Sequence, residues 1–130
     1  MSFLDARNQY RRTEGGVIPD LTNPYKMVMI TLRELQKSLV VLVAAQQKGT
    51  KYPSAHVTKS LTAVYVLQSS LDFEKGGEIA DNLFRVYEFT RLQLLAAFRR
   101  EESPRLEAAL SYIEDLASAW ENMPKGAMQE

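Results

Sequence analysis

Apolar residues recur every three or four positions along most of the chain, and this spacing predicts amphipathic helices. The first inward stripe comprises Val28, Leu32, Leu35, Leu39 and Leu42. The dipeptide Asn23-Pro24 predicts the start of this helix, because an Asn side chain can cap the free N–H groups and proline fits the first turn. Gly49 predicts its end.

Three further stripes follow, each bounded by glycine or proline. The second comprises Val57, Leu61, Val64, Gln68 and Leu71. The third follows a break expected at Gly76-Gly77 and comprises Ile79, Leu83, Val86, Thr90, Leu94 and Ala97. The fourth follows a cap expected at Ser103-Pro104 and comprises Leu106, Leu110, Ile113, Leu116 and Trp120. Connections of about four to eight residues are typical of antiparallel helical neighbours.

These stripes predict an all-α protein, an antiparallel up-down four-helix bundle over residues 23–123. Residues 1–22 contain Gly15-Gly16 and Pro19 without a sustained period, which predicts a flexible N-terminal arm. Residues 124–130 are expected to form a disordered C-terminal tail. A chain of 130 residues is long enough for one domain with a single core.

Charge and composition argue against several classes of partner. Sixteen basic residues balance sixteen acidic ones, so no net field draws the chain to nucleic acid, and no nucleic-acid partner is expected. The absence of cysteine excludes a disulfide framework. The longest apolar run, Leu39 to Ala45, is far shorter than the ~20 residues that span a bilayer, so we expect no membrane insertion and a cytoplasmic location.

The sequence contains few residues in the patterns that are typical of a catalytic site. His56 is the only histidine, so no histidine cluster can bind a metal ion. Asp72, Glu74 and Glu78 flank the glycine pair, but acidic residues beside a turn usually cap and solubilise helix ends. We therefore expect no enzyme activity and no catalytic, cofactor-binding or metal site. An enzyme that uses these carboxylates is the alternative from another class.

The first three helices carry more apolar residues than their inward stripes need. The surplus comprises Met29, Ile30, Val40, Val41, Tyr65 and Val66, together with a second stripe on the third helix formed by Phe84, Tyr87, Arg91 and Leu95. Such a surplus predicts an exposed patch that binds another protein. The alternatives are a thicker core and a bundle that dimerises through the patch.

The segment Leu71–Leu83 reads Leu-Asp-Phe-Glu-Lys-Gly-Gly-Glu-Ile-Ala-Asp-Asn-Leu, and Val86-Tyr87-Glu88-Phe89 follows it. This spacing closely resembles the signature of the FliS family, the flagellar secretion chaperones for flagellin. Further similarities to the family are found at Tyr10, Asn23-Pro24, Lys59 and Trp120. The resemblance therefore covers most of the chain, and it implies the same antiparallel helical bundle.

The sequence also departs from the family pattern. Thr31-Leu32-Arg33-Glu34 replaces the family's usual Leu-Tyr-acidic-Gly in the first helix, so a point of close approach is lost there. Phe89 replaces a common tyrosine, and Leu92-Gln93-Leu94 replaces a more basic run. A variant flagellin as client is compatible with these changes.

The resemblance implies a chaperone that binds the C-terminal segment of unpolymerised flagellin, prevents premature polymerisation and delivers the flagellin to the flagellar type III export gate. Tyr10 is expected either to mask the binding groove or to contact the export gate. The alternative is a dimeric structural or regulatory bundle in flagellar assembly with a different client. The candidate client contacts are Tyr10, Tyr65, Val66, Ile79, Phe84, Tyr87, Arg91 and Leu95.

Overall fold

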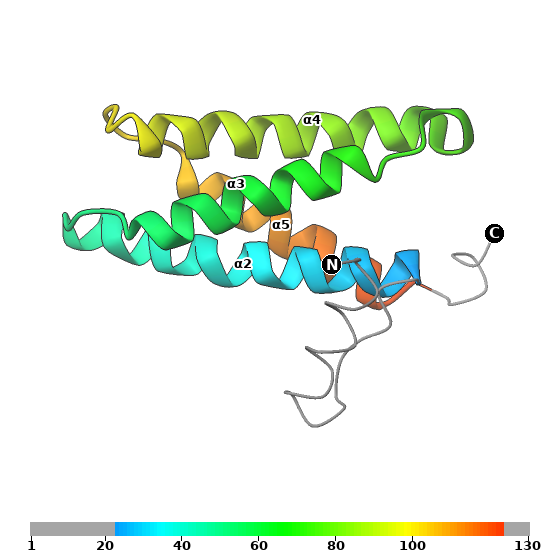
Figure 1. Ribbon diagram of the computed structural model, residues 1–130, viewed down its shortest axis with the longest axis horizontal. Helices are drawn as coiled ribbons and strands as arrows, with labels where there is room; N and C mark the ends of the chain where they lie inside the picture. The colour runs from blue at the N-terminus through cyan, green and yellow to red at the C-terminus, as the bar shows by residue number, and fades with distance from the viewer. Residues whose placement is uncertain (1–22, 124–130) are drawn as a thin grey trace, which may run out of the picture.

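The structure is a computed structural model that describes residues 23–123, and these residues form four α-helices (Figure 1). The helices are α2 (Pro24–Lys48), α3 (Ser54–Ser69), α4 (Phe73–Phe98) and α5 (Leu106–Glu121). Within this range the chain contains no β-strand. The expected arm, residues 1–22 with Tyr10, and the expected tail, residues 124–130, lie outside the described residues.

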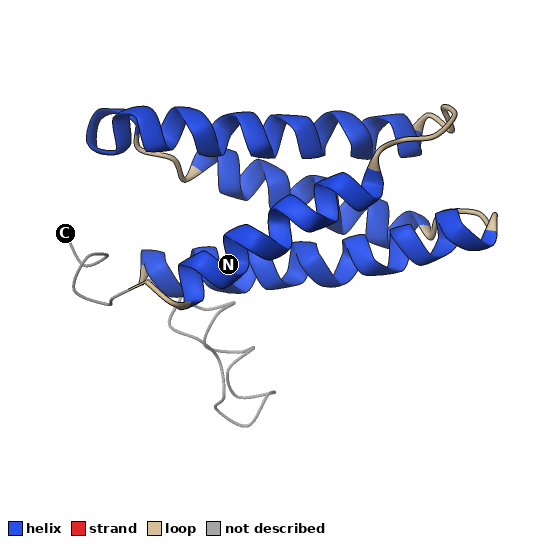
Figure 2. Ribbon diagram, turned by 180° about the vertical axis from the view of Figure 1, so that it is seen from behind, coloured by secondary structure: helices blue, strands red, loops and turns tan. Residues whose placement is uncertain are grey.

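Each helix packs against the next helix along the chain, and α5 packs against α2, so the four helices enclose one core. Successive helices run in opposite directions, as the colour gradient of Figure 1 shows. Figure 1 shows that α3 runs obliquely between α2 and α4, and Figure 2, seen from behind, shows that α5 crosses obliquely on the other side. The predicted all-α four-helix bundle is confirmed.

The core is built around the leucines of α2. Leu35, Leu39 and Leu42 are fully buried, so the first predicted stripe is confirmed at its centre. The second stripe is only partly right: Val57 and Val64 are buried, but Leu71 lies beyond the end of α3. The inward face of α3 instead includes the small or apolar residues Ser60, Ala63 and Leu67.

The two ends of α2 follow the sequence prediction. The Asn23 side-chain oxygen accepts hydrogen bonds from the backbone N–H groups of Tyr25 and Lys26, at 3.0 and 3.3 Å. At the other end Gly49 adopts a left-handed conformation with φ 68°. Its N–H group donates to the carbonyl of Gln46 at 3.1 Å, which is typical of a glycine that ends a helix.

The start of α4 corrects the sequence prediction. The helix begins at Phe73, before the glycine pair, because the Asp72 carboxylate accepts hydrogen bonds from the N–H groups of Glu74 and Lys75. The expected break is instead a kink within α4 at Gly77, with φ 49° and ψ −122°. The kink interrupts the helical phase, and Ile79 is 70% exposed, so its predicted place in the inward stripe is wrong.

The start of α5 also differs from the prediction. Ser103 adopts φ 52° and does not cap the helix, which begins at Leu106. The side-chain oxygen of Gln93 accepts a hydrogen bond from the Arg105 N–H group at 2.7 Å. The side-chain amide of Gln46 donates to the Pro104 carbonyl at 2.8 Å. Gln93 of α4 and Gln46 of α2 therefore hold the connection before α5 in place. A cap at Ser103-Pro104 was expected to do so.

Candidate protein-binding surface

An apolar groove opens at the end of the bundle where α2 and α4 begin and α5 ends. We call it the end groove, and its volume is about 780 Å³. Its apolar lining consists of Pro24, Val28, Leu71, Ile79, Ala80, Leu83, Tyr87 and Trp120. Ser70, Asp72, Lys75 and Gly76 complete the lining. An apolar concave surface with few polar groups is typical of a binding site.

Trp120 braces one wall of the end groove. Its indole N–H group donates to the carbonyl of Tyr25 at 3.3 Å, and the Tyr25 hydroxyl donates to the carbonyl of Trp120 at 3.2 Å. The two rings stack with centroids 6.0 Å apart and planes inclined by 13°. The start of α2 and the end of α5 are thus held together by two reciprocal hydrogen bonds and an aromatic contact.

The glycine pair shapes the start of α4, where Gly76 lines the end groove. A Cβ atom on Gly76 would lie 2.8 Å from the Cβ atom of Ala80, so a larger residue cannot fit without a shift. Gly77 has open space around it, but its positive φ strains any other residue. The two glycines therefore permit the first turn of α4 to fold back, which leaves Ile79 exposed at the edge of the groove.

Tyr87 lies beneath the end groove, within the core. Its side chain is 2% exposed, and burial raises the pKa of its hydroxyl to about 12, so the group is neutral at all ordinary pH values. The structure thus places this candidate contact at the floor of the groove, where only a small part of the ring can meet a client.

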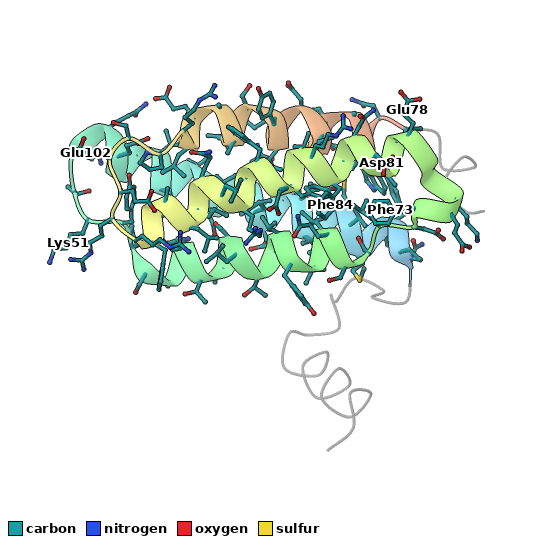
Figure 3. All side chains as sticks on the ribbon, turned by 90° about the horizontal axis from the view of Figure 1, so that it is seen from above. Lys51, Phe73, Glu78, Asp81, Phe84 and Glu102 are labelled. Atoms are coloured by element: carbon teal, nitrogen blue, oxygen red, sulfur yellow. The ribbon has the colours of Figure 1, made fainter. Side chains whose placement is uncertain are left out.

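Exposed aromatic side chains also lie on α3 and α4. We call Tyr65, Phe73 and Phe84 the α3–α4 surface; they are 71%, 49% and 39% exposed. The rings of Phe73 and Phe84 meet edge to face with centroids 6.1 Å apart, and Figure 3 shows them side by side. Phe73 is not among the predicted contacts, although its position next to the Asp72 cap places it in the first turn of α4.

A polar bridge links α3 and α4. The Arg91 guanidinium donates two hydrogen bonds to the Glu88 carboxylate, at 2.7 and 2.6 Å, and the Gln68 amide donates a third at 3.1 Å. The hydrogen bond from Arg91, followed by that from Gln68, lowers the pKa of Glu88 to about 2. Arg91, a candidate client contact, is therefore engaged with Glu88 in this structure.

The other candidates occupy intermediate positions. Val66 and Leu95 are half-buried, so each can contribute only part of its side chain to a surface contact. The structure also exposes apolar residues that the sequence analysis did not single out: Leu92, Phe98 and Tyr112. All three lie outside the inward stripes of their helices. An apolar residue outside a stripe is the sequence signal that identifies them.

Chemical sites of other kinds are not supported by the described part of the chain. Between residues 23 and 123 no group of three or more His, Asp or Glu side chains could hold a metal ion. The carboxylate of Asp72 caps α4, as expected for an acidic residue beside a turn. None of the helices in this range has the length and apolarity that crossing a membrane requires.

The fold and these surfaces define a small helical bundle with apolar side chains available to a partner. Residues 6–127 match the family described as "Flagellar protein FliS", and the chain belongs to this family. The resemblance inferred from the segment around Gly76-Gly77 is thereby confirmed. The family is one of chaperones, which are not a class of enzymes.

Three relatives show how widely the similarity extends. The flagellar secretion chaperone FliS of Vibrio cholerae is 29% identical over 103 residues, which are 78% of this chain and 76% of the relative. The protein of the same name from Salmonella typhimurium is 38% identical over 65 residues, 49% of this chain and 48% of the relative. The flagellar secretion chaperone FliSB of Pseudomonas aeruginosa is 22% identical over 124 residues, 95% and 98% of the two chains. No solved structure gives a significant match to this chain.

Proposed function

We propose that this bundle binds the C-terminal segment of unpolymerised flagellin in the cytoplasm, prevents premature filament polymerisation and delivers the flagellin to the flagellar type III export gate. The observation that carries the proposal is the exposure of large apolar side chains on a small bundle: Tyr65 is 71% exposed, and Ile79 at the end groove is 70% exposed. Membership of a chaperone family supports it.

The energetics favour a long, largely apolar contact. Ordering a disordered client costs about 2–5 kcal/mol. At about 25 cal/mol per Å² of apolar surface, roughly 200 Å² must be buried to offset 5 kcal/mol, before the cost of association itself. One aromatic anchor buries about that much. The end groove and the α3–α4 surface together supply several anchors, so an amphipathic client can gain net affinity.

The α3–α4 surface is held in place before a client arrives. The edge-to-face contact of Phe73 and Phe84 fixes one aromatic pair, and the two Arg91–Glu88 hydrogen bonds with Gln68 fix the helices behind it. A surface that is already ordered loses less conformational entropy on binding. We expect the flagellin segment, rather than the bundle, to undergo the larger change.

Co-purification tests the proposal directly. The chain should retain full-length flagellin, and it should lose flagellin that lacks the C-terminal segment. The double variant Tyr65→Glu, Ile79→Glu should lose binding while its thermal transition is preserved, because both side chains are exposed. Ser111→Glu, on the exposed side of α5, serves as the matched control. Retention of truncated flagellin, or normal binding by the double variant, would contradict the proposal.

The alternative of a dimeric bundle predicts a different result from the same sample. A dimer formed through the α3–α4 surface would show twice the chain mass without flagellin, and the Tyr65→Glu, Ile79→Glu variant would become a monomer. A chaperone that uses this surface for its client should instead form a complex whose mass includes one flagellin.

The predicted N-terminal arm extends this proposal. Pro24, the first residue of α2, lines the end groove. If the arm with Tyr10 masks the groove, removal of residues 1–21 should tighten flagellin binding. Unchanged or weaker affinity would argue against masking and would favour a contact of Tyr10 with the export gate.

A further inference from the structure

The end of the bundle opposite the end groove carries a second, smaller pocket. We call it the tip pocket, and its volume is about 380 Å³. Val57 and Ala97 form a buried floor, 4% and 2% exposed, while Tyr52 is half-buried at the wall. Phe98 lines it too and is 66% exposed. In Figure 3 the labelled Lys51 marks this end, and the labelled Phe73 lies toward the other end.

The charged residues that line the tip pocket leave an excess of positive charge. Lys51 and Arg100 line it, and neither has an ion-pair partner among residues 23–123. Glu101 also lines the pocket, but its carboxylate lies 3.9 Å from the guanidinium of Arg99. An anionic group at the pocket would therefore meet two cations that the protein itself does not neutralise.

The backbone at Arg100 gives independent support. Its N–H group donates to the carbonyl of Ala97 at 3.1 Å, and the Glu101 N–H group donates to the carbonyl of Ala96 at 2.9 Å, so α4 ends in the same hydrogen-bonding pattern as α2. In α2 the left-handed position is occupied by Gly49, whereas in α4 it is occupied by Arg100 with φ 58°. Residues with a Cβ atom are disfavoured in this left-handed conformation. Backbone strain of this kind is often found at functional sites.

We propose that the tip pocket docks an acidic peptide segment of a partner protein, with one apolar side chain inserted between Tyr52 and Phe98 and flanking carboxylates at Lys51 and Arg100. The pocket is large enough for one leucine or aromatic side chain but not for a helix face. Two cations are too few for a nucleic-acid backbone, whose binding depends on many phosphate contacts. Because the pocket is remote from the α3–α4 surface, both can be occupied at once.

The probe for this site is a short fluorescent peptide with a central leucine-phenylalanine pair flanked on both sides by glutamates. It should bind the full chain saturably, and the affinity should fall as salt rises. A peptide with glutamines in place of the glutamates should bind roughly tenfold or more weakly, the loss expected for one charge-assisted contact. Amide NMR shifts on peptide addition should concentrate at residues 50–58 and 97–101.

Arg100→Gly is the most informative variant, because its two expected effects have opposite signs. It should raise the thermal transition by relieving the left-handed backbone, yet weaken peptide binding by roughly tenfold. Lys51→Gln should weaken binding similarly without changing stability. Lys26→Gln, an exposed lysine at the opposite end of the bundle, is the matched control and should bind normally.

Several results would overturn the proposal. These are no saturable binding of the acidic peptide, equal binding of the glutamine peptide, or normal binding by Arg100→Gly and Lys51→Gln. The flagellin-binding variant Tyr65→Glu, Ile79→Glu should bind the acidic peptide normally. If that variant loses the peptide as well, the peptide occupies the α3–α4 surface or the end groove, and the tip pocket is not its site.

Discussion

The two ends of the bundle are closed by different means. At the end groove, long-range contacts do the work: Trp120 and Tyr25 exchange hydrogen bonds across α5 and α2, and Gly77 takes the positive φ that the kink requires. At the opposite end, the connection between α4 and α5 places Arg100 and Ser103 at positive φ without glycine. The positive φ near the end groove is thus adopted by a glycine, which tolerates it. At the opposite end, Arg100 and Ser103 hold a strained backbone conformation.

Stability and function place different demands on the two ends of the bundle. The end groove combines an apolar opening with a firmly braced frame, so a client can bind without distorting the bundle. The tip retains side chains at positions where glycine is favoured. Substitutions of Trp120 and Gly77, which frame the end groove, should therefore be costly, whereas Arg100→Gly at the tip should be stabilising.

Trp120→Ala should give the largest effect, because it removes both the ring stacked on Tyr25 and the indole hydrogen bond. Trp120 also packs against the core, and we expect a loss of about 3 kcal/mol in the free energy of unfolding. Denaturant titration measures it. Tyr112→Ala, which removes a 45% exposed ring, should cost clearly less. Equal losses in the two variants would show that the contacts between Trp120 and Tyr25 stabilise the fold no more than those of an exposed aromatic ring.

Gly77→Ala should cost about 2 kcal/mol, because φ 49° with ψ −122° is a conformation that residues with a Cβ atom rarely adopt. Space is not the cause, since nothing lies within 4 Å of the added atom. The same denaturant titration provides the value. A neutral outcome would mean that the first turn of α4 can straighten, and the end groove would then have to change shape.

The paired substitutions Gly49→Ala and Arg100→Gly should have opposite effects on stability at the tip. Both positions end a helix with the same hydrogen-bonding pattern and with left-handed φ values of 68° and 58°. We expect Gly49→Ala to destabilise by about 1 kcal/mol and Arg100→Gly to stabilise by a similar amount. Differential scanning calorimetry would detect both shifts. Destabilisation by Arg100→Gly would show that the arginine makes a compensating contact.

The features of the fold that depend on local signals can be predicted from the sequence. The Asn23 cap, the Gly49 stop and the central leucines of α2 were predicted because each acts through its own helix. The kink at Gly77 was predicted as a break, since a glycine pair alone does not reveal that Asp72 caps a helical turn before it.

The features that sequence reasoning missed depend on contacts between distant residues. Gln93 and Gln46 hold the connection before α5, and nothing in the local sequence links them to Arg105 or Pro104. The exposure of Tyr65 and Phe84 follows from their helical phase, which can be read from the sequence. The burial of Tyr87 cannot be predicted in this way, because it depends on how all four helices pack.

The bridge between Glu88, Arg91 and Gln68 belongs to neither end and should give the smallest effect. The folded pKa of Glu88 is about 2, below its ordinary value of 4.5, so the bridge stabilises the fold fully above pH 4.5. That contribution is lost as the pH falls through the folded pKa, because the unfolded chain then binds the proton more readily. The groups are partly exposed, so solvent screening limits the contribution to less than about 1 kcal/mol.

The difference in unfolding free energy between the wild type and Glu88→Gln should therefore shrink between pH 7 and pH 3. A difference that stays constant over this range would show that the Glu88 carboxylate stabilises nothing by its charge, and that α3 and α4 are held together by apolar packing alone.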